Sequence, residues 1–262
     1  MSRTPRILIL NYEYPPIGGG AANALSYLLT EFGLIGGVEI DLVTSSHEGK
    51  ESISSVANGI SVHKLAIKKD SLHYWTEREI LGYWSLATRY TNKLLAKEKY
   101  DLCHAFFALP CGAMAYRLRS RVPYIVSLRG SDVPGFNKRF NWMNSFLKPV
   151  FKRVLKASSG VWANSEGLRQ LAKKTTPDID IKIIHNGVDC REFVPAQNRR
   201  PEKRYRLVCV SRLIGRKGID DLITALPKIK AKLGKVELTL VGEGNLKEEL
   251  QALAESQGVS DD

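Results

Sequence analysis

The sequence has few cysteines and no apolar run long enough to cross a membrane. Its 262 residues contain four cysteines without any C-x-x-C pair, the spacing typical of zinc sites. We therefore expect reduced thiols at Cys103, Cys111, Cys190 and Cys209. A bilayer span needs about 20 apolar residues, and the first apolar run, residues 7–10, ends too early for a signal peptide. These absences predict a cytoplasmic protein.

Two further absences narrow the class of protein. The dinucleotide fingerprint G-x-G-x-x-G is missing, because the loop at residues 18–20 is a plain G-G-G, and this argues against a nicotinamide or flavin enzyme. Acidic residues are missing from positions 133–165, in a chain whose formal net charge is +12. Such an excess of positive charge favours an acidic partner or surface.

Short apolar runs alternate with segments of helical periodicity along most of the chain. Strands are predicted at residues 7–10, 38–44, 60–67, 101–106, 123–128, 160–163 and 181–184, and helices at 21–35, 83–98, 110–119, 139–156 and 165–174. This order predicts an α/β domain over residues 1–195, with a doubly wound parallel sheet and binding residues at the carboxyl ends of its strands.

A shorter set of elements follows a polar stretch. Residues 196–206 are basic and contain proline, so we interpret them as a linker. Strands are then predicted at 207–210 and 236–241, and helices at 218–233 and 246–257. Two strands leave the faces and edges of a sheet uncovered. Residues 207–262 therefore predict the first half of a second domain of the same type.

Three cations and two glycines lie between the strand at 207–210 and the helix that follows. The glycines leave backbone N–H groups accessible, and a helix N-terminus carries partial positive charge. With Arg212, Arg216 and Lys217 beside it, this turn would bind a diphosphate. The spacing alone leaves two interpretations open, a diphosphate site and a solvated basic turn.

Two longer runs carry a resemblance to a known family. The run S-R-L-x-x-x-K-G-x-x-x-L-x-x-A begins at Ser211, and I-x-N-G-V-D-x-x-x-F-x-P spans residues 184–195. Both resemble the retaining glycosyltransferases of family 4, which have the GT-B fold of two Rossmann-like domains. The resemblance implies transfer of a sugar from a nucleotide-sugar donor to an acceptor hydroxyl, with retained configuration and without a metal or other cofactor.

The same resemblance implies roles for individual residues. The cations of the basic turn would hold the donor diphosphate, and the glycines after residue 241 would contact its nucleotide. Arg129 stands where the family often has histidine, so only a binding or electrostatic role is carried over to Arg129 and Asp132. The predicted catalytic residues are Arg129, Asp132, Arg212 and Lys217, and the predicted donor-binding residues are Gly18, Gly19, Gly20, Asn186, Arg212, Lys217, Gly242, Gly244 and Leu250.

Basic and aromatic residues alternate along 138–156, a pattern that fits an anionic membrane surface. With the resemblance, it predicts a peripheral membrane enzyme that acts on a lipid-linked or cell-envelope saccharide acceptor. A packed helix with a solvated basic face stays open, and nucleic acid is not expected. Asp178 and Asp180 have the spacing of metal-dependent transferases, but we interpret them as a surface turn, and we interpret His185 as a turn or core histidine rather than a metal ligand.

The family's acidic E-x7-E run, which holds the donor sugar and ribose, lies beyond the second strand and helix pair, and this sequence ends at Asp262 before it. We therefore expect little or no transferase activity from this truncated chain alone. Two alternatives stay open. One is a non-catalytic basic module that binds a membrane or nucleic acid, and the other is a nucleotide-sugar 2-epimerase on the same fold.

Overall fold

The computed structural model describes residues 3–72, 74–136, 141–195 and 204–260, and the side chains of all of these except 141–146. The chain divides into two compact units, residues 1–193 (unit 1) and 194–262 (unit 2). Most of the predicted linker lies outside the described residues, and so does the start of the basic segment, Lys138, Arg139 and Phe140.

Unit 1 is built on an eight-stranded sheet with the order β3-β4-β2-β1-β5-β6-β7-β8. All neighbouring strands are parallel except β3, which pairs antiparallel with β4. The strands are β1 (Arg6–Leu10), β2 (Glu39–Ser46), β3 (Ser52–Ala57), β4 (Ile60–Ala66), β5 (Leu102–Phe106), β6 (Tyr124–Leu128), β7 (Gly160–Ala163) and β8 (Ile181–Ile183). The predicted α/β class and its large parallel sheet are confirmed.

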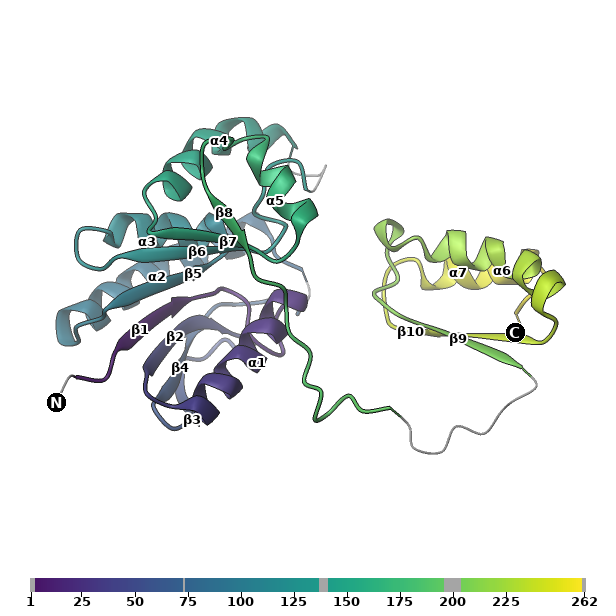
Figure 1. Ribbon diagram of the computed structural model, residues 1–262, viewed down its shortest axis with the longest axis horizontal. Coiled ribbons are helices and arrows are strands. Elements are labelled where there is room, and N and C mark those ends of the chain that lie inside the picture. The colour runs from purple at the N-terminus through teal and green to yellow at the C-terminus, as the bar shows by residue number, and fades with distance from the viewer. Residues whose placement is uncertain (1–2, 73, 137–140, 196–203, 261–262) are drawn as a thin grey trace. The chain divides into compact units, whose positions relative to one another are not determined.

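The helices of unit 1 lie on both faces of this sheet (Figure 1). They are α1 (Gly20–Ile35), α2 (Glu77–Lys97), the π-type turn η1 (Ala108–Gly112), α3 (Ala113–Leu118), α4 (Asn141–Lys156) and α5 (Glu166–Lys173). Across the sheet, the chain passes from β1 to β2 toward one edge, and from β4 through β8 toward the opposite edge. Because parallel crossovers are right-handed, α1 lies on one face and α2 to α5 lie on the opposite face.

Two differences from the predicted elements have local causes. Strand β3 was not predicted, because its serine-rich residues are almost all exposed and show no apolar alternation. Helix α2 starts at Glu77 rather than at residue 83. Its first turn is fixed by a capping box, in which the Thr76 side chain accepts from the Glu79 backbone N–H and the Glu79 carboxylate accepts from the Thr76 backbone.

A buried polar network ties β2 to β4 and to the start of β5. Asp41 accepts hydrogen bonds from His63 at 2.7 Å, from Tyr100 at 2.8 Å and from Arg6 at 2.9 Å. Burial alone would raise the pKa of the Asp41 carboxyl. The hydrogen bonds and the Arg6 charge outweigh burial and hold this pKa below its usual value. The charged carboxylate is therefore part of the folded structure.

Unit 2 consists of two parallel strands and two helices. They are β9 (Tyr205–Val210), the short turn η3 (Gly215–Lys217), α6 (Ile219–Leu233), β10 (Val236–Val241) and α7 (Lys247–Ser256). A small apolar core joins them and includes Leu213, Ile223 and Leu250. Val208, Val210 and Val241 are exposed, so one face of the strand pair is uncovered among the described residues. Within the described residues, no helix is both long and apolar enough to cross a membrane.

Candidate functional site

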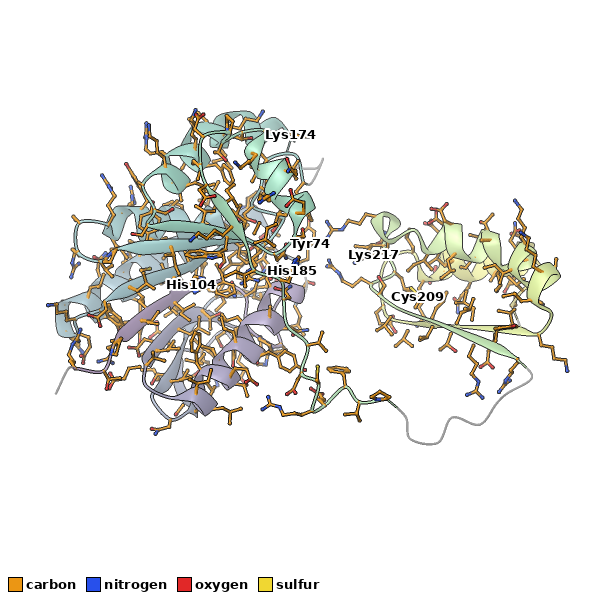
Figure 2. All side chains as sticks on the ribbon, in the orientation of Figure 1. Tyr74, His104, Lys174, His185, Cys209 and Lys217 are labelled. Atoms are coloured by element: carbon orange, nitrogen blue, oxygen red, sulfur yellow. The ribbon has the colours of Figure 1, made fainter. Side chains whose placement is uncertain are left out.

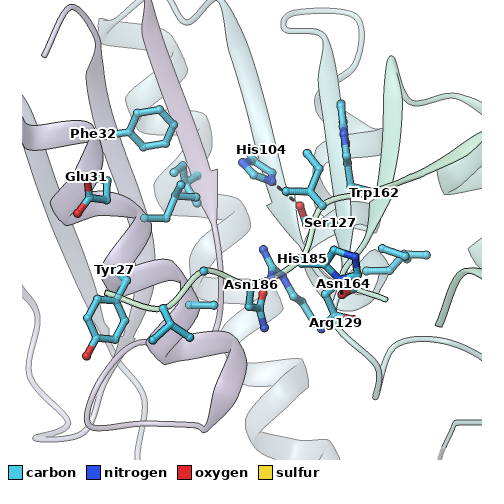
Figure 3. A pocket seen from close by; sticks show the side chains of 18 of the residues that line it. Tyr27, Glu31, Phe32, His104, Ser127, Arg129, Trp162, Asn164, His185 and Asn186 are labelled. Atoms are coloured by element: carbon cyan, nitrogen blue, oxygen red, sulfur yellow. Dashed lines mark hydrogen bonds between the residues drawn. The ribbon is translucent and has the colours of Figure 1, made fainter. Parts of the chain in front are cut away.

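A pocket of about 670 Å³ lies in unit 1, on the same sheet face as α1 (Figure 3). Its floor consists of alternate residues from neighbouring strands, among them Ile7, Leu102, Ile125 and Trp162, and α1 forms one wall. Polar side chains gather at the carboxyl ends of β6, β7 and β8, where the chain continues as Arg129, Asn164, His185 and Asn186. The pocket therefore has an apolar floor and one polar end.

The guanidinium of Arg129 is the main charged group at this polar end. Its Nη1 donates to Asn186 Oδ1 at 2.9 Å, and its Cζ lies 4.1 Å from the centre of the Phe106 ring. Burial lowers the pKa of Arg129 to about 10, so the side chain stays charged at neutral pH. Its Nε is buried and has no hydrogen-bond partner among the described residues.

Asp132 is buried and does not bond to the Arg129 guanidinium. Its two oxygens accept from three backbone N–H groups, those of Ala108 at 2.7 Å, Arg129 at 3.1 Å and Gly130 at 2.9 Å. Burial raises the pKa of this carboxyl, although these N–H groups oppose the shift. Asp132 thus joins the loop after β6 to the start of η1 and fixes the backbone from which Arg129 extends.

His104 and Ser127 form a hydrogen-bonded pair inside the pocket that the sequence patterns did not single out. His104 Nε2 lies 2.7 Å from Ser127 Oγ (Figure 3). Burial, together with the nearby charge of Arg129, lowers the pKa of His104 to about 3. The imidazole is therefore neutral at physiological pH and supplies polarity without charge.

The three glycines before α1 differ in their surroundings. Gly18 has φ of 99°, and a Cβ there would lie 2.7 Å from Glu13 atoms, so the turn itself requires this glycine. A Cβ on Gly19 or Gly20 would meet nothing within 4 Å. Gly19 is the N-cap of α1 and makes no side-chain cap. Open space therefore remains at the N-terminus of this helix.

In unit 2 the predicted cations follow β9 and precede α6. Arg212 and Lys217 are both exposed, and Lys217 ends the short turn η3 (Figure 2). Gly218 has φ of 63° and is the N-cap of α6 without a side-chain cap. The first turn of α6 also contains Asp220 and Asp221, whose charges offset part of the helix dipole. The cations are thus needed if an anion is to bind here.

Gly242 and Gly244 bring the loop after β10 against the backbone of the basic turn. A Cβ on Gly242 would lie 1.9 Å from Ser211 O, and a Cβ on Gly244 would lie 2.1 Å from Leu213 O. Leu213 N–H donates to Glu243 O at 2.9 Å and links the two loops. Leu250 is buried in the core of unit 2. Its contact with a nucleotide stays a prediction, as do the roles of the glycines and cations.

The part of α4 with described side chains, residues 147–156, exposes its charges and buries Phe151, Val154 and Leu155, whereas Val150 is exposed. Lys148, Lys152, Arg153 and Lys156 are exposed, whereas Phe151 is fully buried. Phe151 therefore packs in the core and is not available to enter a membrane. The side chains of Trp142 and Phe146, which also belong to the predicted membrane pattern, lie outside those that the structure describes.

The structure places Asp178, Asp180 and His185 at the surface. Asp178 and Asp180 are exposed in a turn between α5 and β8. His185 is exposed, and its Nδ1 lies 3.1 Å from Asn164 O. Among the residues with described side chains, no group of three or more histidine, cysteine or acidic residues could hold a metal ion. Independence from metal stays a prediction.

The fold defines the class of protein. Unit 1 and unit 2 together have the fold of GT-B glycosyltransferases. The catalytic domain of starch synthase IV from Arabidopsis thaliana, bound to ADP and acarbose, matches 99% of this chain and 73% of its own length, with a TM-score of 0.66 and 14% identity. A trehalose-6-phosphate structure from E. coli, bound with UDP-2-fluoro glucose, matches 96% of this chain and 69% of its own length with a TM-score of 0.62 and 13% identity.

The chain belongs to glycosyltransferase family 4. The sequence model of Glycosyltransferase Family 4 matches residues 18–192, and that of Glycosyl transferases group 1 matches residues 191–262. The GDP-mannose-dependent alpha-(1-6)-phosphatidylinositol monomannoside mannosyltransferase of Mycobacterium tuberculosis is 32% identical over 184 residues, which cover 65% of this chain and 46% of that protein. An uncharacterized glycosyltransferase of Methanocaldococcus jannaschii is 25% identical over 97% of this chain and 67% of its own length. The chain thus spans about half the length of the mannosyltransferase.

Proposed function

We propose that this chain forms the acceptor side and part of the donor side of a retaining glycosyltransferase that uses a nucleotide-sugar. Arg212, Lys217 and the N-terminus of α6 hold the donor diphosphate. As the glycosidic bond of the donor breaks, negative charge grows on the leaving diphosphate. Two fixed cations stabilise this charge without a metal, a preorganised electrostatic effect of several kcal/mol. The acceptor hydroxyl approaches from the side of Gly19, Gly20 and Arg129.

The observation that carries the proposal is the arrangement in unit 2. Arg212 and Lys217 are exposed beside an uncapped helix N-terminus at the carboxyl end of β9. Unpaired N–H groups and two cations at one place form an anion site. Gly242 and Gly244 pack the neighbouring loop onto the same backbone, which fixes the position of the turn.

Donor binding tests this proposal. Titration calorimetry with GDP-mannose, UDP-glucose and ADP-glucose should give saturable binding to at least one of them. Each charge-assisted hydrogen bond contributes about 1.5–3 kcal/mol, so the double variant Arg212→Ala, Lys217→Ala should bind about 100-fold more weakly or worse. Lys228→Ala is the matched control, because Lys228 is exposed on the same helix, about 14 Å from its start. Equal affinity of the double variant and the control would refute the donor site.

We also propose a lipid-linked acceptor at the cytoplasmic membrane face. The mannosyltransferase relative acts, by its name, on a phosphatidylinositol monomannoside. The four exposed cations of α4 supply about 1 kcal/mol each near anionic lipid. Vesicles with phosphatidylserine should bind the chain and release it as salt rises, and binding should weaken when Lys148, Lys152 and Lys156 are changed to Gln. Binding that is insensitive to salt and to these changes would refute this electrostatic contact.

A further inference from the structure

A buried lysine lies in the segment between β4 and α2. The side chain of Lys69 is 1% exposed, and its Nζ lies 3.1 Å from a Glu79 carboxylate oxygen and 3.8 Å from the centre of the Trp75 ring. The same Nζ donates to the backbone O of Tyr74 at 2.5 Å. A buried pair of this kind adds little net stability compared with apolar side chains of the same size. It does fix a geometry, because each of its hydrogen bonds has a direction.

The carboxylate of Glu79 ties the same segment to the first turn of α2. Besides Lys69, it accepts from the backbone N–H of Asp70 at 3.3 Å and from the backbone N–H of Thr76 at 2.7 Å. Burial alone would raise the pKa of Glu79, and the hydrogen bonds outweigh it and hold that pKa below its usual value. The charged carboxylate therefore fixes the segment at two positions, one on either side of Trp75.

This anchored segment contacts the glycine loop, residues 11–20, at two places. Near the end of the loop, the Gly18 N–H donates to Leu72 O at 2.7 Å. Gly18 is buried, so its N–H would be costly without this acceptor. At the start of the loop, the Trp75 ring packs edge-on against the Tyr12 ring, with the ring centres 4.9 Å apart. One segment thus holds both ends of the loop.

The outermost residues of the loop depend on this support. A Cβ on Gly19 or Gly20 would meet nothing within 4 Å, so neighbouring side chains do not hold these two residues in place. Their backbone is fixed through Gly18 on one side and through α1 on the other. Ordering the backbone of one residue costs about a factor of ten in an equilibrium constant. A contact that orders Gly18 in advance therefore strengthens binding at the positions that follow it.

We propose that Lys69 is a positioning residue for the glycine loop. Through the Leu72 carbonyl and the Trp75 ring, it holds the backbone of residues 18–20 in the conformation that binds ligand, and it does not touch the ligand itself. The inference rests on the proposed function and deepens it, because residues 18–20 are among those predicted to bind the donor.

Hydrogen exchange of the full chain tests the structural step. In Lys69→Met, the amides of residues 17–20 should exchange at least tenfold faster than in the unchanged chain, as read by mass spectrometry of overlapping fragments. The matched control is Tyr100→Phe, which removes a 2.8 Å hydrogen bond to Asp41 at the amino ends of the strands, away from the loop. The two variants are compared at urea concentrations that give them equal free energies of unfolding.

Under these conditions the control should leave the exchange of residues 17–20 within about twofold of the unchanged chain, since these amides exchange by local opening. Equal acceleration in the two variants would overturn the proposal, because Lys69 would then act only through the stability of the whole unit.

Donor binding tests the functional step. The ligand is whichever of GDP-mannose, UDP-glucose and ADP-glucose binds the unchanged chain, and calorimetry measures its affinity where each variant is folded. Lys69→Met should bind this nucleotide-sugar at least tenfold more weakly, and Tyr100→Phe should stay within about twofold. An unchanged affinity in folded Lys69→Met, together with faster exchange of residues 17–20, would overturn the proposal, because the loop would then not need to be held.

The double variant Lys69→Met, Glu79→Gln covers the case in which a lone Glu79 carboxylate prevents folding. It removes both charges and keeps an acceptor for the Thr76 N–H, so it should fold and show the same faster exchange and weaker binding. Normal exchange and affinity in this variant would overturn the proposal. If none of the three nucleotide-sugars binds the unchanged chain, the proposed function is refuted, and the exchange comparison alone decides whether Lys69 positions the loop.

Discussion

A single methyl group at position 244 can force apart two loops of unit 2, the loop after β10 and the loop after β9. A Cβ at position 244 would lie 2.1 Å from Leu213 O and 2.6 Å from its carbonyl carbon, and both atoms belong to the backbone. Carbon and oxygen in contact are normally more than 3 Å apart, so Gly244→Ala must shift one loop by about 1 Å. Overpacking of this kind costs about 1–3 kcal/mol. A shift of 1 Å in a positioning group costs about 100-fold in function.

The expected result for Gly244→Ala is a lower denaturation midpoint for unit 2 and a nucleotide-sugar affinity weaker by about 10-fold to 100-fold. Urea unfolding and calorimetry measure the two quantities. Gly215→Ala is the matched control, because it lies in the basic turn and its Cβ would have no neighbour closer than 3.9 Å. That control keeps the backbone N–H of position 215. A Gly244→Ala variant with the affinity and stability of Gly215→Ala would show that the contact between the loops does not position the cations.

Three further predictions concern unit 1. Because the folded-state pKa of Asp41 is below its usual value, the stability it supplies is present above that usual value and is lost as pH falls through the folded pKa. Asp41→Asn should therefore flatten the fall in the free energy of unfolding below about pH 4, measured by urea titration at several pH values, and an unchanged slope would contradict this. The side chains of Lys69 and Glu79 are 1% and 9% exposed and lie 3.1 Å apart. Lys69→Met should therefore reduce the free energy of unfolding by about 3 kcal/mol, and the double variant Lys69→Met, Glu79→Gln should reduce it distinctly less. Equal losses would show that the pair is not coupled. Burial raises the pKa of the Cys111 thiol to about 12 and also raises the pKa of Cys103. A thiol reagent should therefore modify the exposed Cys190 first and leave Cys103 and Cys111 unmodified until the chain unfolds. Mass spectrometry of the labelled chain measures this order. Rapid labelling of Cys103 in the folded chain would contradict that burial.

The sequence predicted the elements whose signals are local. The run Ile7–Leu10 is apolar because β1 is buried between two layers, and α1 has the spacing of a helix with one buried stripe. The exposed β3 carries no such signal, since its pairing with β4 comes from the turn at residues 58–59 and from backbone hydrogen bonds. The capping box at Thr76 and Glu79 could have been read, and it would have placed the start of α2 correctly.

The same difference between local and long-range signals applies to the candidate sites. Arg212 and Lys217 are close in sequence, so a motif could single them out. The pairing of Arg129 with Asn186 spans 57 residues and depends on the order of β6, β7 and β8 in the sheet. His104, Ser127 and Trp162 were missed because each looks like an ordinary alternate residue of a strand. Their common face becomes visible when the register of β5 to β7 is known.

The carboxylate of Asp132 affects how the position of Arg129 can differ between related chains. It fastens the start of η1 and the loop after β6 to one side chain, so these two segments move together. A substitution within residues 108–112 can therefore act on the backbone at Arg129 through the Asp132 carboxylate. If the acceptor role proposed for Arg129 is correct, substitutions at 108–112 should alter acceptor preference although those residues hold Arg129 only through Asp132.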